Sequence, residues 1–406
     1  MPASHTFIIS GTGCALVDYL YKPIDFNDPE FMRYLSKIPG DGGLSPGKLV
    51  FTEEFEKFSG EPYARVRDKI TRGMKPITPN IGGPSIVSLI HAAQILHGLS
   101  AGVRFYGCRG ADEGGKFIES KLTLTPLNIG LFKTGSHYTP FTDVLSDPDF
   151  DQGHGERIFV NNIGAAWDFK PGDLDDSFFR SDMVVFGGTA LVPHIHFSLG
   201  QLLKTAREHR ALTVVNTVYD FLSEKHDPSK PWKLGDTVET YRYIDLLVTD
   251  MEEALRLSGT GSVEAAVQFF KSSGTGALII THGSNEVHFF SDNSLFGKVP
   301  YSRLPVSEKV KTELKQSVEK PGDTTGCGDN FTGGVIASVA KQLMEMPGKQ
   351  VSIFDAVALG VASGGFACFY NGGTFFEEFP GRKAQLVEPY YRDYLSQVGL
   401  SKTDQV

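Results

Sequence analysis

The sequence predicts an α/β fold with a mostly parallel central sheet and helices on both of its faces, giving three αβα layers. From about residue 180 onward, short apolar runs alternate with helical patterns, and the first part of the chain shows the same alternation. Strands that alternate with helices are typical of parallel sheets, because each connecting helix covers one face of the sheet. The chain has 406 residues, a length that large α/β enzymes with an insertion reach.

The expected elements follow from these local patterns. Buried strands are expected at FIISGTG, VRFYG, MVVFGG, LTVVNT, IDLLVTD and ALIITHG. Helices are expected at SIVSLIHAAQILHG, FSLGQLLKTAREH, MEEALRLSG and SVEAAVQFFKSSG. A further helix is expected over residues 330–345, because apolar side chains recur there at every fourth position.

Two long stretches interrupt the alternation. Residues 19–79 are polar and mixed, with Gly/Pro clusters, and residues 128–169 alternate loosely between turn signals. We therefore predict a single domain over residues 1–406, with a small β lid built from parts of these two stretches. Residues 307–321 are expected to form a solvated surface connection.

The composition excludes some classes of partner. Lysine and arginine total 39, aspartate and glutamate total 48, and the formal net charge is −9. A chain this acidic, without a cluster of basic residues, is a poor candidate for binding nucleic acid or an anionic membrane. No window approaches about 18 uninterrupted apolar residues, so no spanning helix is expected.

The cysteines and the N-terminus indicate a cytoplasmic protein. Cys14, Cys108, Cys327 and Cys368 include no CxxC pair, which favours reduced thiols over a disulfide framework or a zinc site. The first ten residues have no basic region and only a three-residue apolar run, so no signal peptide is expected.

Three short motifs carry little weight. GADEGGK at residues 110–116 matches the spacing of a phosphate-binding P-loop, but Phe117 stands where a Ser or Thr should bind Mg²⁺. GTG at residues 11–13 lacks the third glycine of a dinucleotide fingerprint. His194 and His196 form an HxH pair without a nearby third ligand, which favours ordinary histidines over a metal site.

The stretch DTTGCGDNFTGG, residues 323–334, carries the strongest signal. Its glycines form a turn that leads into the helix expected at residues 330–345, and a helix N-terminus favours a bound anion. An acid beside an anion site should repel the anion. Asp329 makes sense there if it accepts a proton while the backbone holds a phosphate group.

This stretch resembles the signature DTxGAGD of the ribokinase family, the PfkB carbohydrate kinases, with Cys327 where alanine is usual. Other segments resemble family motifs in the expected order. GTGCALVD ends in an acid of the first strand, Asp18, and IGGPS contains the glycine pair Gly82 and Gly83, followed by Val87 where asparagine is usual.

Three more segments extend the resemblance over nearly the whole chain. GCRGADEGGKFI is similar to the family's GxxGxDxxG and contains Asp112. VTDMEEA is similar to NxxE, with Asp250 in place of asparagine and Glu253 retained. IITHGSNEV is similar to the nucleotide-binding TxG turn, at Thr281 and Gly283.

The resemblance implies a ribokinase-like fold and a role for each matched residue. Asp329 would be the catalytic base, and the N–H groups of Gly326, Cys327 and Gly328 would form the anion hole. The implied acceptor-binding residues are Asp18, Gly82, Gly83 and Asp112, and the implied ATP-binding residues are Asp250, Thr281 and Gly283. Glu253 would hold Mg²⁺ through water, and Asp323 and Thr325 match positions that hold a monovalent cation, K⁺, in some relatives.

The function implied is ATP-dependent transfer of the γ-phosphoryl group to a hydroxymethyl group of a sugar. A nucleoside kinase is the alternative, because the layout of residues 19–79 is similar to that of adenosine kinases. Two further candidates are a binding protein that senses a sugar or nucleotide without turnover and a P-loop hydrolase. The expected partner is a small-molecule substrate, and a homodimer is one open expectation for the assembly.

Overall fold

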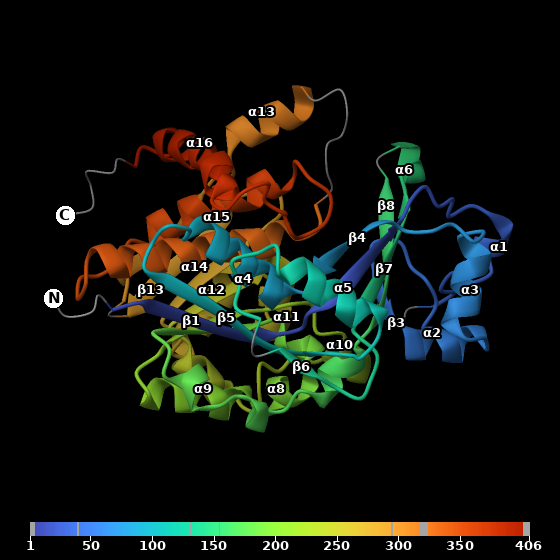
Figure 1. Ribbon diagram of the computed structural model, residues 1–406, viewed down its shortest axis with the longest axis horizontal. Helices are drawn as coiled ribbons and strands as arrows, with labels where there is room; N and C mark the ends of the chain where they lie inside the picture. Colours follow the sequence, from blue (N-terminus) through green and yellow to red (C-terminus); the bar gives the residue numbers. More distant parts are fainter. Residues whose placement is uncertain are drawn as a thin grey trace.

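The structure is a computed structural model that describes residues 5–38, 40–129, 132–153, 155–293, 295–316 and 324–400. Within these residues a central sheet of nine strands crosses the molecule (Figure 1). In spatial order the strands are β14 (Gly297–Leu304), β13 (Val287–Asn293), β12 (Ala277–Thr281), β11 (Leu246–Asp250), β10 (Leu212–Asn216), β9 (Met183–Gly187), β1 (Phe7–Gly13), β5 (Ala101–Arg109) and β6 (Phe132–Thr134).

The strands from β12 to β6 pair in parallel, as predicted for the alternating pattern. Each predicted strand is present and mostly buried. The antiparallel pair β13–β14 at one edge was not predicted. Its outer strand alternates between half-buried and exposed residues and contains Pro300, a pattern that lacks the continuous apolar run of a buried strand.

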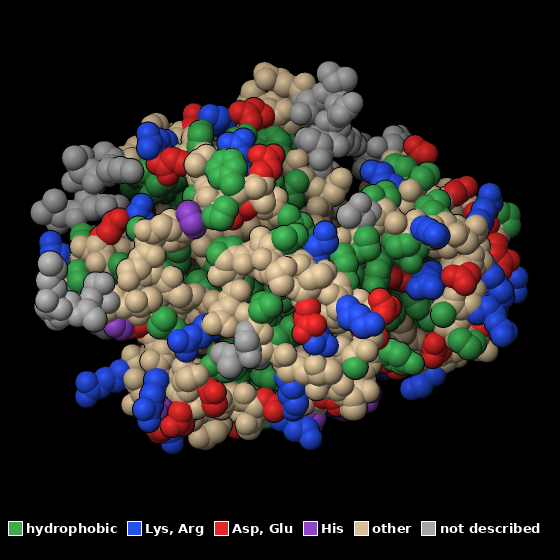
Figure 2. All heavy atoms as spheres, in the orientation of Figure 1, with side chains coloured by type: hydrophobic (Ala, Val, Ile, Leu, Met, Phe, Trp, Pro, Cys, Tyr) green, Lys and Arg blue, Asp and Glu red, His purple; other side chains and the backbone are tan. Residues whose placement is uncertain are grey.

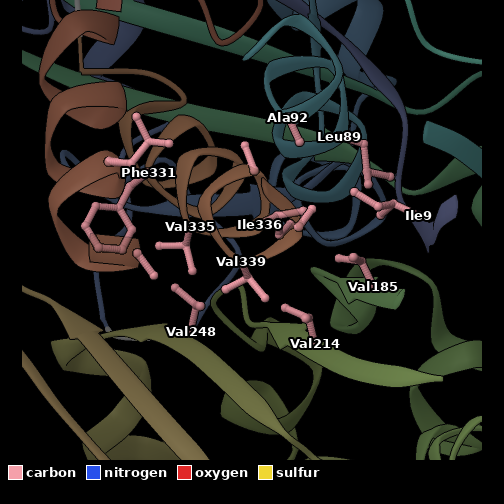
Figure 3. Close-up of a cluster of buried hydrophobic side chains, with 14 of the residues drawn as sticks. Ile9, Leu89, Ala92, Val185, Val214, Val248, Phe331, Val335, Ile336 and Val339 are labelled. Carbon is pink, nitrogen blue, oxygen red and sulfur yellow. The ribbon is translucent and has the colours of Figure 1, made fainter. Parts of the chain in front are cut away.

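One helical layer packs on the sheet through the cluster drawn in Figure 3. Ile9, Val185, Val214 and Val248 point from the strands toward this layer. They meet side chains of two of its helices, namely Leu89, Ala92, Phe331, Val335, Ile336 and Val339. The helices of the layer are α4 (Pro84–Ile95), α5 (Glu113–Leu122), α13 (Glu308–Gln316), α14 (Cys327–Glu345), α15 (Ile353–Ala367) and α16 (Arg382–Gln397). The helix predicted at 330–345 is therefore confirmed, with its four-residue apolar spacing facing the sheet.

The opposite face of the sheet carries the second helical layer. Alternate strand residues such as Val184, Phe186 and Val215 point into it. Its elements are α7 (Asp176–Phe179), α8 (Pro193–Phe197), α9 (Leu199–Glu208), α10 (Phe221–His226), α11 (Met251–Ser258) and α12 (Val263–Ser272), with the 3₁₀ turns η1 (Gly164–Asp168), η2 (Pro171–Asp173), η3 (Thr189–Leu191) and η4 (Val238–Tyr243). The predicted three-layer arrangement is confirmed.

A second, five-stranded sheet stands at one end of the molecule (Figure 1). Its order is β3 (Leu49–Phe51), β8 (Glu156–Asn162), β7 (Phe141–Asp147), β2 (Leu16–Tyr21) and β4 (Ile77–Gly82). Helices α1 (Pro29–Met32), α2 (Thr52–Ser59) and α3 (Tyr63–Ile70) cover one face of it, and α6 (Phe150–Gly153) lies between β7 and β8. Both predicted insertions contribute strands to this sheet, which we call the lid sheet. Its closing motion stays a prediction.

Two surface features complete the description. Residues 308–316 form helix α13, with Val310 buried, so this part of the expected surface connection is a packed helix, while residues 317–321 lie outside the described residues. Figure 2 shows Lys and Arg side chains interspersed with Asp and Glu side chains across the viewed face.

Over the described residues, no helix combines the length and apolar character needed to cross a membrane.

Candidate active site

The loop before helix α14 has a backbone that only glycine adopts without strain. Gly326 is the N-cap of the helix, with φ 74°, and a Cβ atom there would lie 2.4 Å from the Cα of Gly373. The Cys327 N–H donates to the Thr324 carbonyl at 3.3 Å. Of the three N–H groups predicted to form an anion hole, that one is thus engaged within the loop. Gly328 is exposed, and nothing lies within 4 Å of the position its Cβ would take.

A pocket of about 200 Å³ opens beside this helix start. It lies at the carboxyl ends of β10, β11 and β12, where parallel sheets usually bind ligands. The predicted residues that line it are Gly328, Asp329, Asp250, Glu253 and Thr281, and its other lining residues include Asn216, Thr217 and Thr332. We call it the phosphate pocket, after the group that the sequence analysis predicts to bind there. The chain folds so that residues from three separate predicted motifs meet in it.

Asp329 lies in the first turn of α14 and lines the phosphate pocket. Desolvation of the carboxyl group raises its pKa from 3.8 to about 6. A carboxylate with a raised pKa is a stronger base than an ordinary aspartate and is still ionised at neutral pH. The position therefore suits proton abstraction next to a bound phosphate group.

Glu253 and Asp250 form a capping box at the start of α11. Asp250 accepts a hydrogen bond from the Glu253 N–H at 2.8 Å, and the Glu253 carboxylate is buried against the hydroxyls of Thr217 and Thr249. Burial first, and then the charge of Asp250, raise the pKa of Glu253 to about 8. An acid buried in this way favours either a proton or a nearby cation.

These two acids fit a magnesium ion. Mg²⁺ prefers oxygen ligands, retains several waters and is usually held by one or two carboxylates together with substrate phosphates. Among the described residues no group of three or more His, Cys, Asp or Glu side chains could form a complete protein cage. Asp250 and Glu253 at the edge of the phosphate pocket match the open arrangement instead.

The TxG turn connects the phosphate pocket with a second pocket of about 420 Å³. Thr281 lines the first, and His282 and Ser284 line the second. Gly283 between them has φ 54°, a left-handed conformation that glycine adopts readily. The far wall of the second pocket is formed by Pro305, Val306 and Lys311.

A third pocket, of about 350 Å³, lies between the lid sheet and the C-terminal part of the chain. It contains Thr325 and Asp18, and we call it the acceptor pocket after the role predicted for Asp18. A Cβ on Gly82 would lie 2.1 Å from Oδ2 of Asp18, and a Cβ on Gly83, at φ 110°, would lie 2.3 Å from the Cys14 carbonyl oxygen. Gly82 thus makes room for the Asp18 side chain, and Gly83 makes room for the backbone at Cys14.

Asp112 is placed differently from the other predicted substrate residues. It caps helix α5, where Oδ1 accepts the Gly115 N–H at 2.9 Å and Oδ2 accepts the Thr139 N–H at 2.8 Å. The Thr139 hydroxyl adds a third hydrogen bond at 2.5 Å. These contacts give Asp112 a structural role, and its contact with substrate stays a prediction.

The P-loop and HxH motifs gain no support. Lys116 is exposed on α5 and pairs with Glu113 at 2.6 Å, while Phe117 packs on the core. His196 is buried with its ring nitrogens 2.9 Å from the Thr189 hydroxyl and the Lys233 carbonyl, as an ordinary core histidine.

Arg157 was missed by the sequence analysis. It extends from lid strand β8 and donates to the hydroxyls of Thr325 at 2.9 Å and Thr324 at 2.7 Å. It thereby joins the lid sheet to the loop before α14. A single arginine at the start of a strand of mixed composition gives no local signal of this contact. Asp323, the other predicted cation ligand, lies outside the described residues.

The fold and these pockets define an α/β protein with pockets along the carboxyl edge of its central sheet, and comparison with known proteins identifies its family. The model of the pfkB family of carbohydrate kinases matches residues 88–379, so the chain belongs to that family. Adenosine kinase from Schistosoma mansoni in complex with 2-fluoroadenosine is similar in structure, with a TM-score of 0.67 and 18% identity over 91% of this chain and 97% of that one.

Two further solved structures share the fold. Adenosine kinase from Sinorhizobium meliloti has a TM-score of 0.66 and 18% identity over 94% of this chain and 99% of its own. Ribokinase from Thermotoga maritima has a TM-score of 0.59 and 18% identity over 95% of this chain and 99% of its own. The predicted family and ribokinase-like fold are confirmed.

Proposed function

We propose that the protein is an ATP-dependent kinase that transfers the γ-phosphoryl group to a hydroxymethyl group of a sugar or sugar-containing small molecule. The observation that carries this proposal is the position of Asp329, a desolvated carboxylate in the first turn of α14. The loop leading to it lines the acceptor pocket through Thr325 and the phosphate pocket through Gly328. A base between an acceptor and a phosphate site is what phosphoryl transfer to an alcohol requires.

ATP would span the first two pockets. Its phosphates would lie at the N-terminus of α14, near the Gly328 N–H, and its base would lie beyond the TxG turn, near His282 and Ser284. Glu253 and Asp250 would hold Mg²⁺ through water. Bound Mg²⁺ would neutralise charge on the phosphate oxygens.

The acceptor would bind between the lid sheet and the loop. Asp18 lines this pocket and would accept hydrogen bonds from sugar hydroxyls. Arg157 ties the lid strand β8 to Thr324 and Thr325, so closing the lid sheet would bring a positive charge toward the transferred group. Closure would also exclude water, which competes with the acceptor for the phosphoryl group.

A nucleoside is the second candidate acceptor. The acceptor pocket is lined by the aromatic rings of Tyr370, Phe375 and Phe376 and by the apolar side chains of Leu20 and Val144. Aromatic and apolar walls favour an acceptor that carries a flat base in addition to the sugar.

The experiment is an ADP-release screen of the purified protein against pentoses, hexoses, their phosphates and nucleosides. Acceptor-dependent ADP release, confirmed by mass of the phosphorylated product, is the expected result. A nucleoside preference of tenfold or more in kcat/KM, about 1.4 kcal/mol, would select the second candidate. ATP binding without release for any acceptor would instead support a binding protein without turnover.

A further inference from the structure

A lysine is buried directly behind the start of helix α14. Lys383 is the second residue of α16, and only 1% of it is exposed. Burying an ammonium group is costly unless polar partners compensate, and a methionine would fill similar space without that cost. The retained charge therefore calls for a reason beyond packing.

The ammonium contacts one residue of the active-site helix. Lys383 Nζ donates to Oδ1 of Asn330 at 2.8 Å, and it lies 5.5 Å and 5.8 Å from the ring centroids of Tyr370 and Phe375. The Tyr370 hydroxyl donates to the same Asn330 oxygen at 3.1 Å. Asn330 follows Asp329 directly in the chain.

Asn330 is in turn hydrogen-bonded to the loop before α14. Its Nδ2 donates to the carbonyl oxygens of Gly326 and Gly373, both at 2.8 Å. These two glycines lie against each other, so that a Cβ atom on Gly326 would lie 2.4 Å from the Cα of Gly373. The ammonium group thus fixes the amide orientation of Asn330, and Asn330 fixes the loop.

The surroundings leave the positive charge weakly balanced. Glu377 is the acid that acts on the ammonium, and its carboxylate accepts the Lys383 backbone N–H at 2.7 Å. The neighbouring His91 is fully buried, and burial together with the Lys383 charge lowers its pKa, so it adds no second charge. Burial lowers the pKa of Lys383 to about 7, so near neutral pH the group exchanges between its amine and ammonium forms, and either form can donate the hydrogen bond to Asn330.

We propose that Lys383 is a positioning residue for phosphoryl transfer, which holds the Gly326–Asp329 loop in place through its hydrogen bond to Asn330. This inference rests on the proposed kinase function. It assigns to Lys383 an effect on the rate of transfer, where the bound phosphoryl group gains charge on its oxygens, more than on the binding of ATP or acceptor.

The test compares Lys383→Met with the wild type and with Lys341→Met. Methionine keeps the volume and removes the charge, whereas Lys341 lies on α14 with a partly exposed side chain near Glu345 and serves as the matched control. We expect Lys383→Met to lower kcat by about 10- to 100-fold, as for other residues that orient a reacting group from behind. The KM for ATP and for acceptor should stay within about threefold, and Tm should not fall.

Lys383→Ala gives a second, independent readout by chemical rescue. Methylammonium chloride should restore part of its kcat in a saturable way, while sodium chloride at equal ionic strength should not. A near-wild-type kcat in folded Lys383→Met would overturn the inference. So would a loss of kcat that parallels a loss of Tm, with no rescue by methylammonium, because that pattern is structural.

The outcome remains separable from the proposed function. Wild-type turnover in the ADP-release assay tests the kinase function itself, and only the ratio of variant to wild type tests Lys383. Calorimetric titration of ATP into Lys383→Met checks that the nucleotide site is intact, with an expected Kd within about threefold of wild type, and a larger change would contradict a role in the transfer step.

Discussion

Replacing Asp329 by asparagine is expected to lower activity and to raise stability at the same time. Asparagine keeps the size of the side chain but cannot accept the acceptor's proton, so kcat should fall by about 10²- to 10⁴-fold. The stability change follows from the pKa of the carboxyl group, which desolvation raises from 3.8 to about 6. At about 1.36 kcal/mol per pKa unit, the ionised carboxylate costs the folded state at most about 3 kcal/mol.

The sign of the pH dependence follows from the same shift. The folded protein binds a proton at Asp329 more tightly than the unfolded chain does, so the cost is fully present above pH 6 and is lost below pH 3.8. The Tm of Asp329→Asn should exceed that of the wild type at pH 7.5, and the excess free energy should fall to about half at pH 5. Thermal scans at both pH values and single-turnover assays measure the two effects. A variant with wild-type kcat, or one that is less stable than the wild type at pH 7.5, would refute the reasoning.

Three more predictions address the remaining parts of the site. Mg²⁺ bound at Glu253 as proposed would compete with a proton there, because the pKa of Glu253 is raised to about 8; the Mg²⁺ concentration for half-maximal rate should then fall from pH 6 to pH 8, and Glu253→Gln should remove this trend. Gly82→Ala should raise the KM for acceptor about tenfold, because its Cβ would displace Asp18, while a Kd for ATP that changed equally would contradict the placement. Lys116→Ala should leave ATP binding unchanged by calorimetry, and a loss above about 1.4 kcal/mol, tenfold in Kd, would support the P-loop interpretation.

The central sheet could be predicted because its strands are buried on both faces. Such strands are continuous runs of apolar residues in the sequence, and most residues of β9, β10, β11 and β12 are apolar. The edge hairpin β13–β14 lacks this signal. The lid sheet could be anticipated only as two excursions, because its strand order joins β2 to β7 and β8 to β3 across long separations in sequence.

In the candidate site, too, residues with a local sequence signal were predicted, and residues that only tertiary packing brings there were not. Gly326 and Gly83 have positive φ angles that favour glycine locally, so these positions are visible in the sequence. Arg157 and Lys383 were not found, because they reach the loop from positions 168 and 53 residues away in the chain. Only the register of β8 and the packing of α16 against α15 and α4 bring them there.

Lys383 and Asp329 are a buried base and a desolvated acid near the α14 N-terminus, and their effects on stability should depend on pH in opposite directions. Burial lowers the pKa of Lys383 from 10.5 to about 7, which corresponds to at most about 5 kcal/mol of cost to the folded state. The unfolded chain binds this proton more tightly, so the cost is fully present below pH 7 and is lost above pH 10.5. The gain in Tm of Lys383→Met should therefore be largest at pH 6 and clearly smaller at pH 9, where about 2 kcal/mol of the cost of burying the lysine remains. The gain in Tm of Asp329→Asn should instead increase as the pH rises from 5 to 7.5. Thermal scans of both variants over this range check the pair, and a pH-independent gain in either one would show that packing, not charge, sets the effect.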